Sequence, residues 1–169
     1  MIYTRQKSQT KNILLIFFTF TAIFLLSCNN NVIYDESIKI PDNVWDMNNI
    51  ATFKPTIDSI NTPYDISLNI RHAHLYPSQN LWLFISTKSP NGKMQVDTFE
   101  CILADEKGDW FGDGSGDIWD VKIPYMQNIA FPESGEYLIT VQHGMRIEKL
   151  PLIMEIGIEI EKTEIQEKE

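Results

Sequence analysis

The chain of 169 residues has room for one domain of ordinary size, which excludes a typical two-domain enzyme. Hydrophobic residues make up 43% and charged residues 22% of the chain, so a polytopic membrane protein and a wholly disordered chain are both poor fits. The 14 Lys and Arg stand against 23 Asp and Glu, and the net charge of -9 repels phosphate backbones, which disfavours nucleic acid as a partner.

The amino terminus has the pattern of an export signal. Arg5, Lys7 and Lys11 precede an uncharged apolar run of 14 residues from Ile13 to Leu26. This run is shorter than the roughly 20 apolar residues that a membrane-spanning helix needs. We therefore predict a cleaved signal peptide over residues 1–27 rather than a permanent transmembrane anchor.

The apolar run ends in Leu25-Leu26-Ser27-Cys28, which resembles the lipobox of bacterial lipoproteins, although Leu26 is larger than usual at its place. The resemblance implies that a diacylglycerol alkylates the Cys28 thiol, that cleavage follows Ser27, and that the freed amine is acylated too, with palmitate as an expected chain. An ordinary signal peptide that happens to have a Cys near the cut is the alternative. Because stable anchoring takes two or three acyl chains, we expect residues 28–31 to tether the protein to a lipid bilayer.

The mature chain would be more acidic than the precursor. Residues 1–27 hold three basic residues and no acidic one, which leaves 11 basic and 23 acidic residues and a net charge of -12. This charge opposes binding flat on an anionic membrane surface. Lipidation would also consume one of the two cysteines, so no intramolecular disulfide remains. We expect Cys101, among apolar neighbours, to be a buried small hydrophobe rather than a reactive thiol.

From Val32 onward the apolar residues recur at every second position, as in strands with one buried and one wet face. The alternation is clearest over residues 64–71 and recurs over 137–141 and 152–161, whereas residues 81–85 are apolar on both faces, as in a central strand. Further strands are predicted over three segments: 32–40, 51–57 and 119–125. We expect Pro124 to end the last of these, at a sheet edge.

A hairpin is predicted where Ser89-Pro90-Asn91-Gly92 lies between Lys88 and Lys93. Its return strand, residues 94–103, changes phase between Val96 and Phe99, through a bulge or a change of covering neighbour. The whole pattern predicts an all-β fold: an antiparallel β-sandwich, Ig-like or jelly-roll-like, of about eight strands over residues 32–162. A closed barrel is the alternative, and residues 163–169 are expected to form a charged, frayed tail.

The segment from Asp105 to Asp117 combines acidic residues with Gly and is the most unusual stretch of the chain. Its carboxylates recur at every fourth residue, unlike the spacing of an EF-hand loop, so a turn-rich connection is favoured over a calcium site. The aromatic and acidic residues of this region form a candidate partner or ligand surface: Trp110, Asp113, Asp117 and Trp119.

We predict no catalytic residue, no metal site and no cofactor, and therefore not an enzyme. His72 and His74 would share a strand face and could bind zinc with His143, but nothing in the sequence brings the three together. There is no Gly-x-Ser-x-Gly elbow for a hydrolytic triad. The tryptophans could instead stack on sugars, although core positions are more common for Trp in a small sandwich: Trp45, Trp82, Trp110 and Trp119.

An ordered set of short motifs resembles the GldH family of gliding motility lipoproteins. The motifs extend through the mature chain to about Lys162, in the family's order: Val32-Ile33-Tyr34-Asp35-Glu36, Ile40-Pro41-Asp42-Asn43-Val44-Trp45, Tyr76-Pro77, Asn80-Leu81-Trp82-Leu83-Phe84, Asp97-Thr98, Gly116-Asp117-Ile118, Phe131-Pro132-Glu133-Ser134-Gly135-Glu136-Tyr137 and Gln142-His143-Gly144-Met145-Arg146.

This resemblance implies a non-catalytic envelope lipoprotein that supports gliding motility and the associated protein secretion machinery through contacts with other envelope proteins. Only Cys28 carries over as a defined functional position. Because no acidic cluster follows Cys28, we expect the outer membrane, facing the periplasm. A lipid-anchored carbohydrate-binding sandwich is the alternative function.

Overall fold

The computed structural model of the chain describes residues 31–163. The predicted signal peptide over 1–27, the lipid-attachment site Cys28, residues 29 and 30 of the tether and residues 164–169 of the tail lie outside the described residues. Within the described part, no helix has the length and apolar character needed to span a bilayer.

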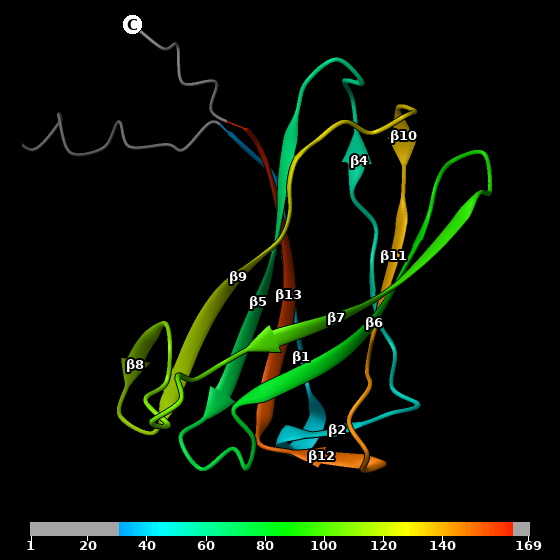
Figure 1. Cartoon of the computed structure of the whole chain (residues 1–169). Coiled ribbons are helices and arrows are strands. Elements are labelled where there is room, and N and C mark those ends of the chain that lie inside the picture. Colours follow the sequence, from blue (N-terminus) through cyan, green and yellow to red (C-terminus); the bar gives the residue numbers. More distant parts are fainter. Residues whose placement is uncertain (1–30, 164–169) are drawn as a thin grey trace, which may run out of the picture. The chain divides into compact units, whose positions relative to one another are not determined.

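The described residues form an all-β fold in which every strand pair is antiparallel. Five strands make one sheet, in this order: β1 (Val32–Lys39), β13 (Ile153–Lys162), β5 (Tyr64–Ala73), β9 (Ile118–Ile129) and β8 (Asp113–Ser115). Four make the other: β3 (Ala51–Phe53), β11 (Leu138–His143), β6 (Asn80–Lys88) and β7 (Met94–Ile102). These are separate sheets rather than a closed barrel, which confirms the predicted sandwich (Figure 1).

Two short ribbons complete the fold. The first pairs β2 (Val44–Asp46), which follows the 3₁₀ turn η2 (Pro41–Asn43), with β12 (Lys149–Pro151). The second pairs β4 (Thr56–Ile57) with β10 (Gly135–Glu136). The predicted strand over 51–57 is therefore two strands with different partners. Neither β2 nor β12 was predicted, because strands of three residues are too short to show a period.

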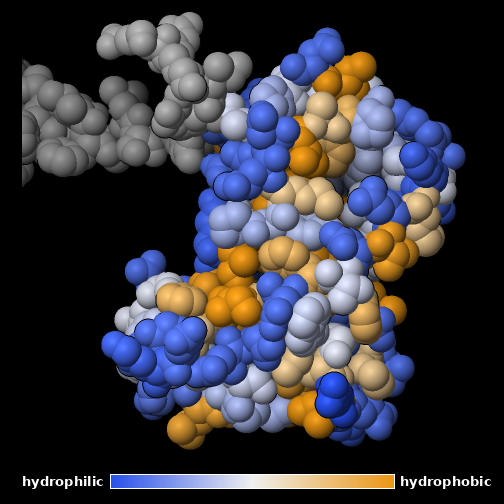
Figure 2. Space-filling model, in the orientation of Figure 1, coloured by the Kyte–Doolittle hydropathy of each residue, from blue (hydrophilic) through white to orange (hydrophobic). Residues whose placement is uncertain are grey.

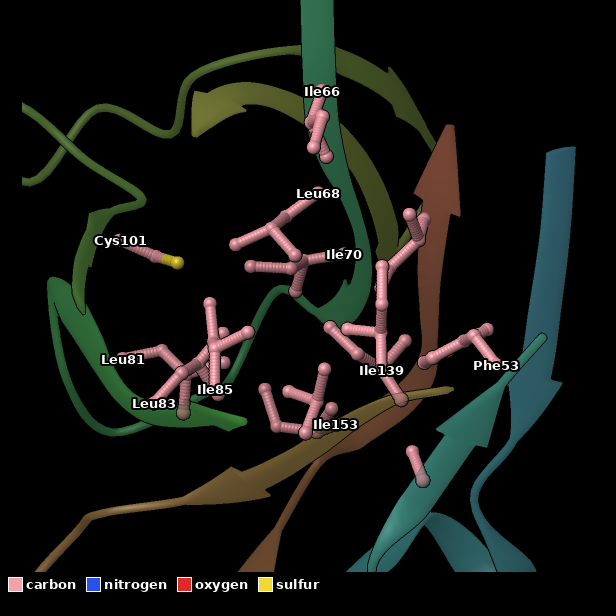
Figure 3. Close-up of a cluster of buried hydrophobic side chains, with 14 of the residues drawn as sticks. Phe53, Ile66, Leu68, Ile70, Leu81, Leu83, Ile85, Cys101, Ile139 and Ile153 are labelled. Carbon is pink, nitrogen blue, oxygen red and sulfur yellow. The ribbon is translucent and has the colours of Figure 1, made fainter. Parts of the chain in front are cut away.

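The core is the space between the two sheets, where the inward residues of both sheets meet (Figure 3). The predicted alternation holds in β5, where Ile66, Leu68 and Ile70 are buried. Cys101 of β7 is buried too, as predicted, and burial raises the pKa of its thiol to about 12. Such a thiol stays protonated at neutral pH and packs as a small apolar side chain.

Two strand predictions were wrong in detail. In β13 a register shift lies between Ile153 and Glu155, and Leu152 just before it has a positive φ of 69°, so Ile153 enters the core instead of Leu152. Strand β9 does not end at Pro124 but continues to Ile129. The missing N–H of Pro124 is tolerated because β8 pairs only with residues 118–120, which leaves one side of β9 open farther along.

The predicted hairpin is confirmed. Its register distinguishes between the two explanations given for the phase change in the return strand, a bulge and a change of covering neighbour. The pairing of β6 with β7 runs without a shift from Lys88 opposite Met94 to Asn80 opposite Ile102. The inward face of β7 is polar at Gln95 and Asp97 and becomes apolar afterwards. No bulge interrupts the described pairing of β6 with β7, so the phase change reflects a change of covering neighbour.

We predict that the buried histidines make the protein less stable in mild acid. His72 and His143 are fully buried, and burial lowers the pKa of both imidazoles. Below the unfolded pKa of about 6.5, the unfolded chain binds protons that the folded chain refuses, so the free energy of unfolding falls. Between about pH 7.5 and about pH 5.5, each histidine should remove up to about 1 kcal/mol from the free energy of unfolding.

Urea unfolding of the His143→Phe protein at the two pH values should show a smaller loss than the wild type. His74 is exposed and serves as the matched control, because His74→Phe should leave the loss unchanged. Equal losses in the wild type and the His143→Phe protein would contradict the prediction.

Candidate functional site

The four residues predicted as a partner surface gather around the carboxyl end of β5. Trp110 donates its indole N–H to the main-chain oxygen of His74 (3.2 Å), and the His74 N–H donates to the main-chain oxygen of Asp117 (2.7 Å). Asp113 and Trp119 lie on the adjoining β8–β9 hairpin, where Trp119 is opposite His72 of β5. The sequence therefore identified residues that the fold does bring to one end of the sandwich.

Packing occupies much of both indole rings. The Trp110 ring meets the His72 ring edge-on, with 4.6 Å between centroids, and also contacts Tyr76. Gly114 lies against Trp119, since a Cβ at Gly114 would come within 2.9 Å of the indole. Of the four predicted residues, Asp113 and Asp117 are exposed, whereas Trp110 and Trp119 are partly buried.

Two metal sites were considered from the sequence: calcium in the Asp/Gly segment and zinc at the histidines. Within residues 31–163, no group of three or more His, Cys, Asp or Glu side chains is placed to hold either metal ion. In the Asp/Gly segment, the Asp105 carboxylate accepts the main-chain N–H groups of Lys107 and Asp109, as expected of a turn. His72 and His143 lie on different sheets, and His74 is exposed.

A second candidate surface was not predicted from the sequence. Trp82 and Phe84 of β6 point away from the core and are 38% and 44% exposed. With Thr98, Met145 and Ile147 they line a groove of about 560 Å³, named here the aromatic groove. An exposed apolar concavity is a candidate interaction site.

The groove is built by close main-chain contacts. The Gly144 N–H donates to the main-chain oxygen of Trp82 (2.7 Å), and the Trp82 N–H lies 3.4 Å from the Met145 sulfur. A Cβ at Gly144 would lie 3.1 Å from the Phe84 ring, so a glycine here lets the turn after β11 pack against that ring. The Phe84 ring thus has Gly144 close to one side, and both aromatic side chains remain partly exposed.

The prediction that residues 81–85 are buried on both faces was therefore wrong. Strand β6 is central within its sheet, between β11 and β7, but no layer covers the outer face of that sheet within the described residues. The cross-strand partners carried the missing signal. Trp82 is opposite Glu100 and Phe84 is opposite Thr98, and such polar partners indicate a wet face.

The apolar outer surface continues onto β7, the edge strand of the four-stranded sheet. Met94, Val96 and Ile102 lie on its outer face and are all strongly exposed. Within residues 31–163, strand β7 pairs only with β6, so its other side presents main-chain groups that no strand of this part pairs with. Such an edge is available to a strand from another protein.

The model of one protein family, described as GldH lipoprotein, matches residues 32–160 of this chain. A gliding motility lipoprotein GldH homolog of Christiangramia forsetii is 36% identical over 155 residues, which cover 87% of this chain and 94% of that protein. The gliding motility lipoprotein GldH of Flavobacterium johnsoniae is 30% identical over 151 residues, 85% of this chain and 92% of that protein.

Among solved structures, a chain of the infectious bursal disease virus Gx strain is 13% identical and matches 80% of this chain and 35% of that chain. Its TM-score of 0.20 is too low to support a shared fold.

We predict that Gly112 is essential for the β8–β9 hairpin that carries Asp113 and Trp119. Gly112 has a φ of +85°, and a Cβ there would lie 2.1 Å from the main-chain oxygen of Asp120. Gly116 also has a positive φ, of +64°, but a Cβ there would meet nothing within 4 Å. Gly116→Ala should therefore cost only the backbone strain, about 1 kcal/mol.

Gly112→Ala should lower the free energy of unfolding by about 1–3 kcal/mol more than Gly116→Ala, because the backbone must also move. Urea unfolding followed by tryptophan fluorescence measures both variants. Equal destabilisation would show that the hairpin is not pinned at Gly112.

Proposed function

Because the chain belongs to the GldH lipoprotein family, we propose that it is a lipid-anchored envelope protein that supports gliding motility and the associated protein secretion machinery by binding other envelope proteins. The family is named for gliding motility and for lipid attachment, not for a reaction. The proposal accordingly includes no catalytic step, cofactor or metal.

The anchoring part of the proposal rests on Cys28. The basic start, the uncharged run and the Leu-Leu-Ser-Cys order are what a lipoprotein signal peptide requires, and polar Asn29 to Asn31 follow at once. In this proposal residues 1–27 are removed, residues 28–31 form the tether and residues 32–162 form one folded domain. The absence of an acidic cluster after Cys28 supports the periplasmic face of the outer membrane.

The observation that carries the binding part is the aromatic groove. Trp82 and Phe84 are large, rigid side chains of the type that dominates protein interfaces, and they are exposed where a core residue would be hidden. The apolar edge strand β7 extends the same surface. We therefore assign the aromatic groove and the outer face of β7 to an envelope protein that offers apolar side chains.

The position of the groove fits this role. Strand β13 begins just after β12, whose Leu150 lines the groove, and ends at Lys162, whose N–H donates to the main-chain oxygen of Asn31. A strand of ten residues is about 30 Å long, so the groove and the tethered end lie about that far apart. The groove would thus remain accessible above the membrane surface.

The alternative, a carbohydrate-binding module, needs open indole rings to stack on sugars. Packing against His72, Tyr76 and Gly114 engages Trp110 and Trp119, and Trp45 is fully buried. Only Trp82 remains as an exposed platform among the four tryptophans of the described domain. We therefore favour protein binding over sugar binding for this chain.

The first test of the proposal concerns the anchor. Cys28→Ser should prevent lipidation and move the protein from the membrane fraction to the soluble fraction, since no acyl chain then holds it. Colony spreading of cells that carry only this variant should fall to the level of a deletion. Cell fractionation, intact-mass spectrometry and spreading on agar measure the three effects.

Cys101→Ser is the matched control, because Cys101 is buried in the core and should leave the protein in the membrane fraction. A membrane-bound, spreading-competent Cys28→Ser strain would contradict the proposal.

The second test concerns the aromatic groove. Replacing Trp82 and Phe84 together by Ser should weaken partner binding by about thirtyfold or more, the effect of losing an aromatic hot spot. Colony spreading and the yield of chemical crosslinks to envelope proteins should both fall. Because the two side chains are partly exposed, the fold should persist, which circular dichroism checks.

Ile60→Ser is the control, since Ile60 is 46% exposed, close to the 44% of Phe84, but does not line the groove. Equal effects of the two variants would count against the groove, and glycan binding that is lost with Trp82 would favour the carbohydrate-binding alternative.

A further inference from the structure

A cavity of about 330 Å³ lies between the two sheets and is named here the interlayer pocket. Its walls come from both layers and are mainly aliphatic and aromatic: Ile66, Leu68, Ile85, Phe131, Ile139 and Ile158. All six side chains are buried. The pocket thus runs from the surface, at exposed Lys93, Gln95 and Ala130, into the space between the two sheets.

Irregularities of β9 explain why the layers part here. The pairing of β5 with β9 shifts register twice, between Tyr64 and Ile66 and between Ile66 and Ser67. Asn128 in the same stretch has a positive φ of 52°. Such irregularities bend a strand away from regular pairing, and the bent part of β9 forms one side of the pocket.

The mouth of the pocket lies between β9 and β7, each of which has an open side there. Figure 2 shows hydrophobic side chains gathered over the space between these two strands, with hydrophilic ones around them. Gln95, Asp97 and Lys93 line the mouth from the β7 side. This position explains why the inward residues Gln95 and Asp97 of β7 are polar, because they line the mouth of the pocket and do not pack against the core.

One hydrogen bond joins the two strands across the mouth. The Tyr125 hydroxyl of β9 donates to the Asp97 carboxylate of β7 (3.1 Å), and the Tyr125 ring packs edge-on against Phe99, with 5.1 Å between centroids. Burial and the adjacent carboxylate raise the pKa of Tyr125, so the hydroxyl remains a donor. This contact limits the mouth on the side of Phe99.

The pocket lies at the tethered end of the domain. The main-chain oxygen of Asn31 is bonded to Lys162, which is opposite Tyr64, and Ile66 of the pocket is two residues farther along β5. Asn31 precedes β1, and three strand spacings, about 14 Å, separate β1 from β9. Cys28 is three residues before Asn31, so the tether adds up to about 11 Å of reach.

We propose that the interlayer pocket holds one acyl chain of the lipid on Cys28 of the same molecule. This inference rests on the lipidation in the proposed function. The tether covers about 11 Å of the roughly 14 Å between β1 and β9. An acyl chain on Cys28 is longer than the remaining few ångströms and therefore reaches the mouth. The chain enters between β9 and β7 and lies against the aliphatic side chains of both sheets.

The size and chemistry of the pocket match one acyl chain. A cavity of about 150 Å³ holds a benzene, with six carbons, so 330 Å³ holds roughly a dozen carbons at similar packing. A sugar would leave its hydroxyl groups without partners against Ile66, Ile139 and Ile158, which opposes its binding. The polar groups at the mouth, Lys93 and Gln95, suit the ester or amide end of the chain.

Occupancy of the pocket would change how strongly the lipid holds the protein in the membrane. Two or three chains hold a lipoprotein stably in a bilayer, whereas a single chain holds it only reversibly. A chain withdrawn into the pocket is shielded from water without contributing to membrane binding. The domain would then rest with its tethered end close to the bilayer and with fewer chains inserted.

The test uses the full-length lipidated protein in phospholipid vesicles, purified from cells grown on a fatty acid that carries a photoreactive diazirine. After irradiation, peptide mass spectrometry should find an internal crosslink between the lipid of the Cys28 peptide and the peptides that contain Ile66, Leu68 or Ile158. Pocket peptides that carry a phospholipid instead would overturn the proposal, because the occupant would then come from the membrane.

Two exposed positions of one stretch give matched variants. Ala130 lines the mouth and Gln127 does not. Ala130→Trp should lower the internal crosslink by about tenfold or more, since each methylene kept out of an apolar site weakens occupancy about fourfold. Gln127→Trp should leave it unchanged. An equal yield in both variants, or no label in pocket peptides, would overturn the proposal.

Intact-mass spectrometry of the same sample separates the two levels of failure. A lipid on Cys28 without an internal crosslink overturns only the pocket proposal. A mature chain with no lipid on Cys28 overturns the proposed anchoring as well.

Discussion

A sandwich of two sheets covers only one face of each sheet, and this constraint shapes every surface of the protein. Inward residues such as Leu68 and Ile158 bury against the opposite layer, which supplies most of the driving force for folding. A strand that is apolar on both faces must then expose one of them. Strand β6 is such a strand, and its outward Trp82 and Phe84 form the aromatic groove. The open sides of β7 and β9 follow from the same constraint, because a sheet that does not close into a barrel has edges.

Alternation predicted the fold because it reports which face is covered. It located β5 and indicated the sandwich, whereas β6 was predicted from a continuous apolar run and the hairpin after Lys88 from its turn residues. It failed where the backbone departs from a regular strand: the register shift near Ile153 places that residue in the core instead of Leu152. It also could not find β2, β8 or β12, since strands of three residues are too short to show a period, and β2 and β12 pair with each other over a long sequence separation.

The candidate sites differ in how much of them the sequence contains. Trp110, Asp113, Asp117 and Trp119 are close in sequence, so their proximity at the end of β5 was predictable. The aromatic groove joins β6 to the turn after β11, and the interlayer pocket joins both sheets, so neither is visible without the long-range register. One trace of the pocket was present in the sequence. The phase change in β7 marks the point where the neighbour of its inward face changes from the mouth of the pocket to the core.

The two ends of β13 separate the two proposed contacts of the protein. At its carboxyl end, the Lys162 N–H donates to the main-chain oxygen of Asn31, and the proposed tether to a lipidated Cys28 would keep that end close to the bilayer. At its amino end, β12 and the aromatic groove lie about 30 Å away. The net charge of -12 expected of the mature chain opposes binding flat on an anionic surface, which fits a domain that stands upright on the proposed tether. In this proposed orientation the groove would be open to partners while the interlayer pocket would face the lipid, and a change in pocket occupancy would alter the anchor without touching the partner surface.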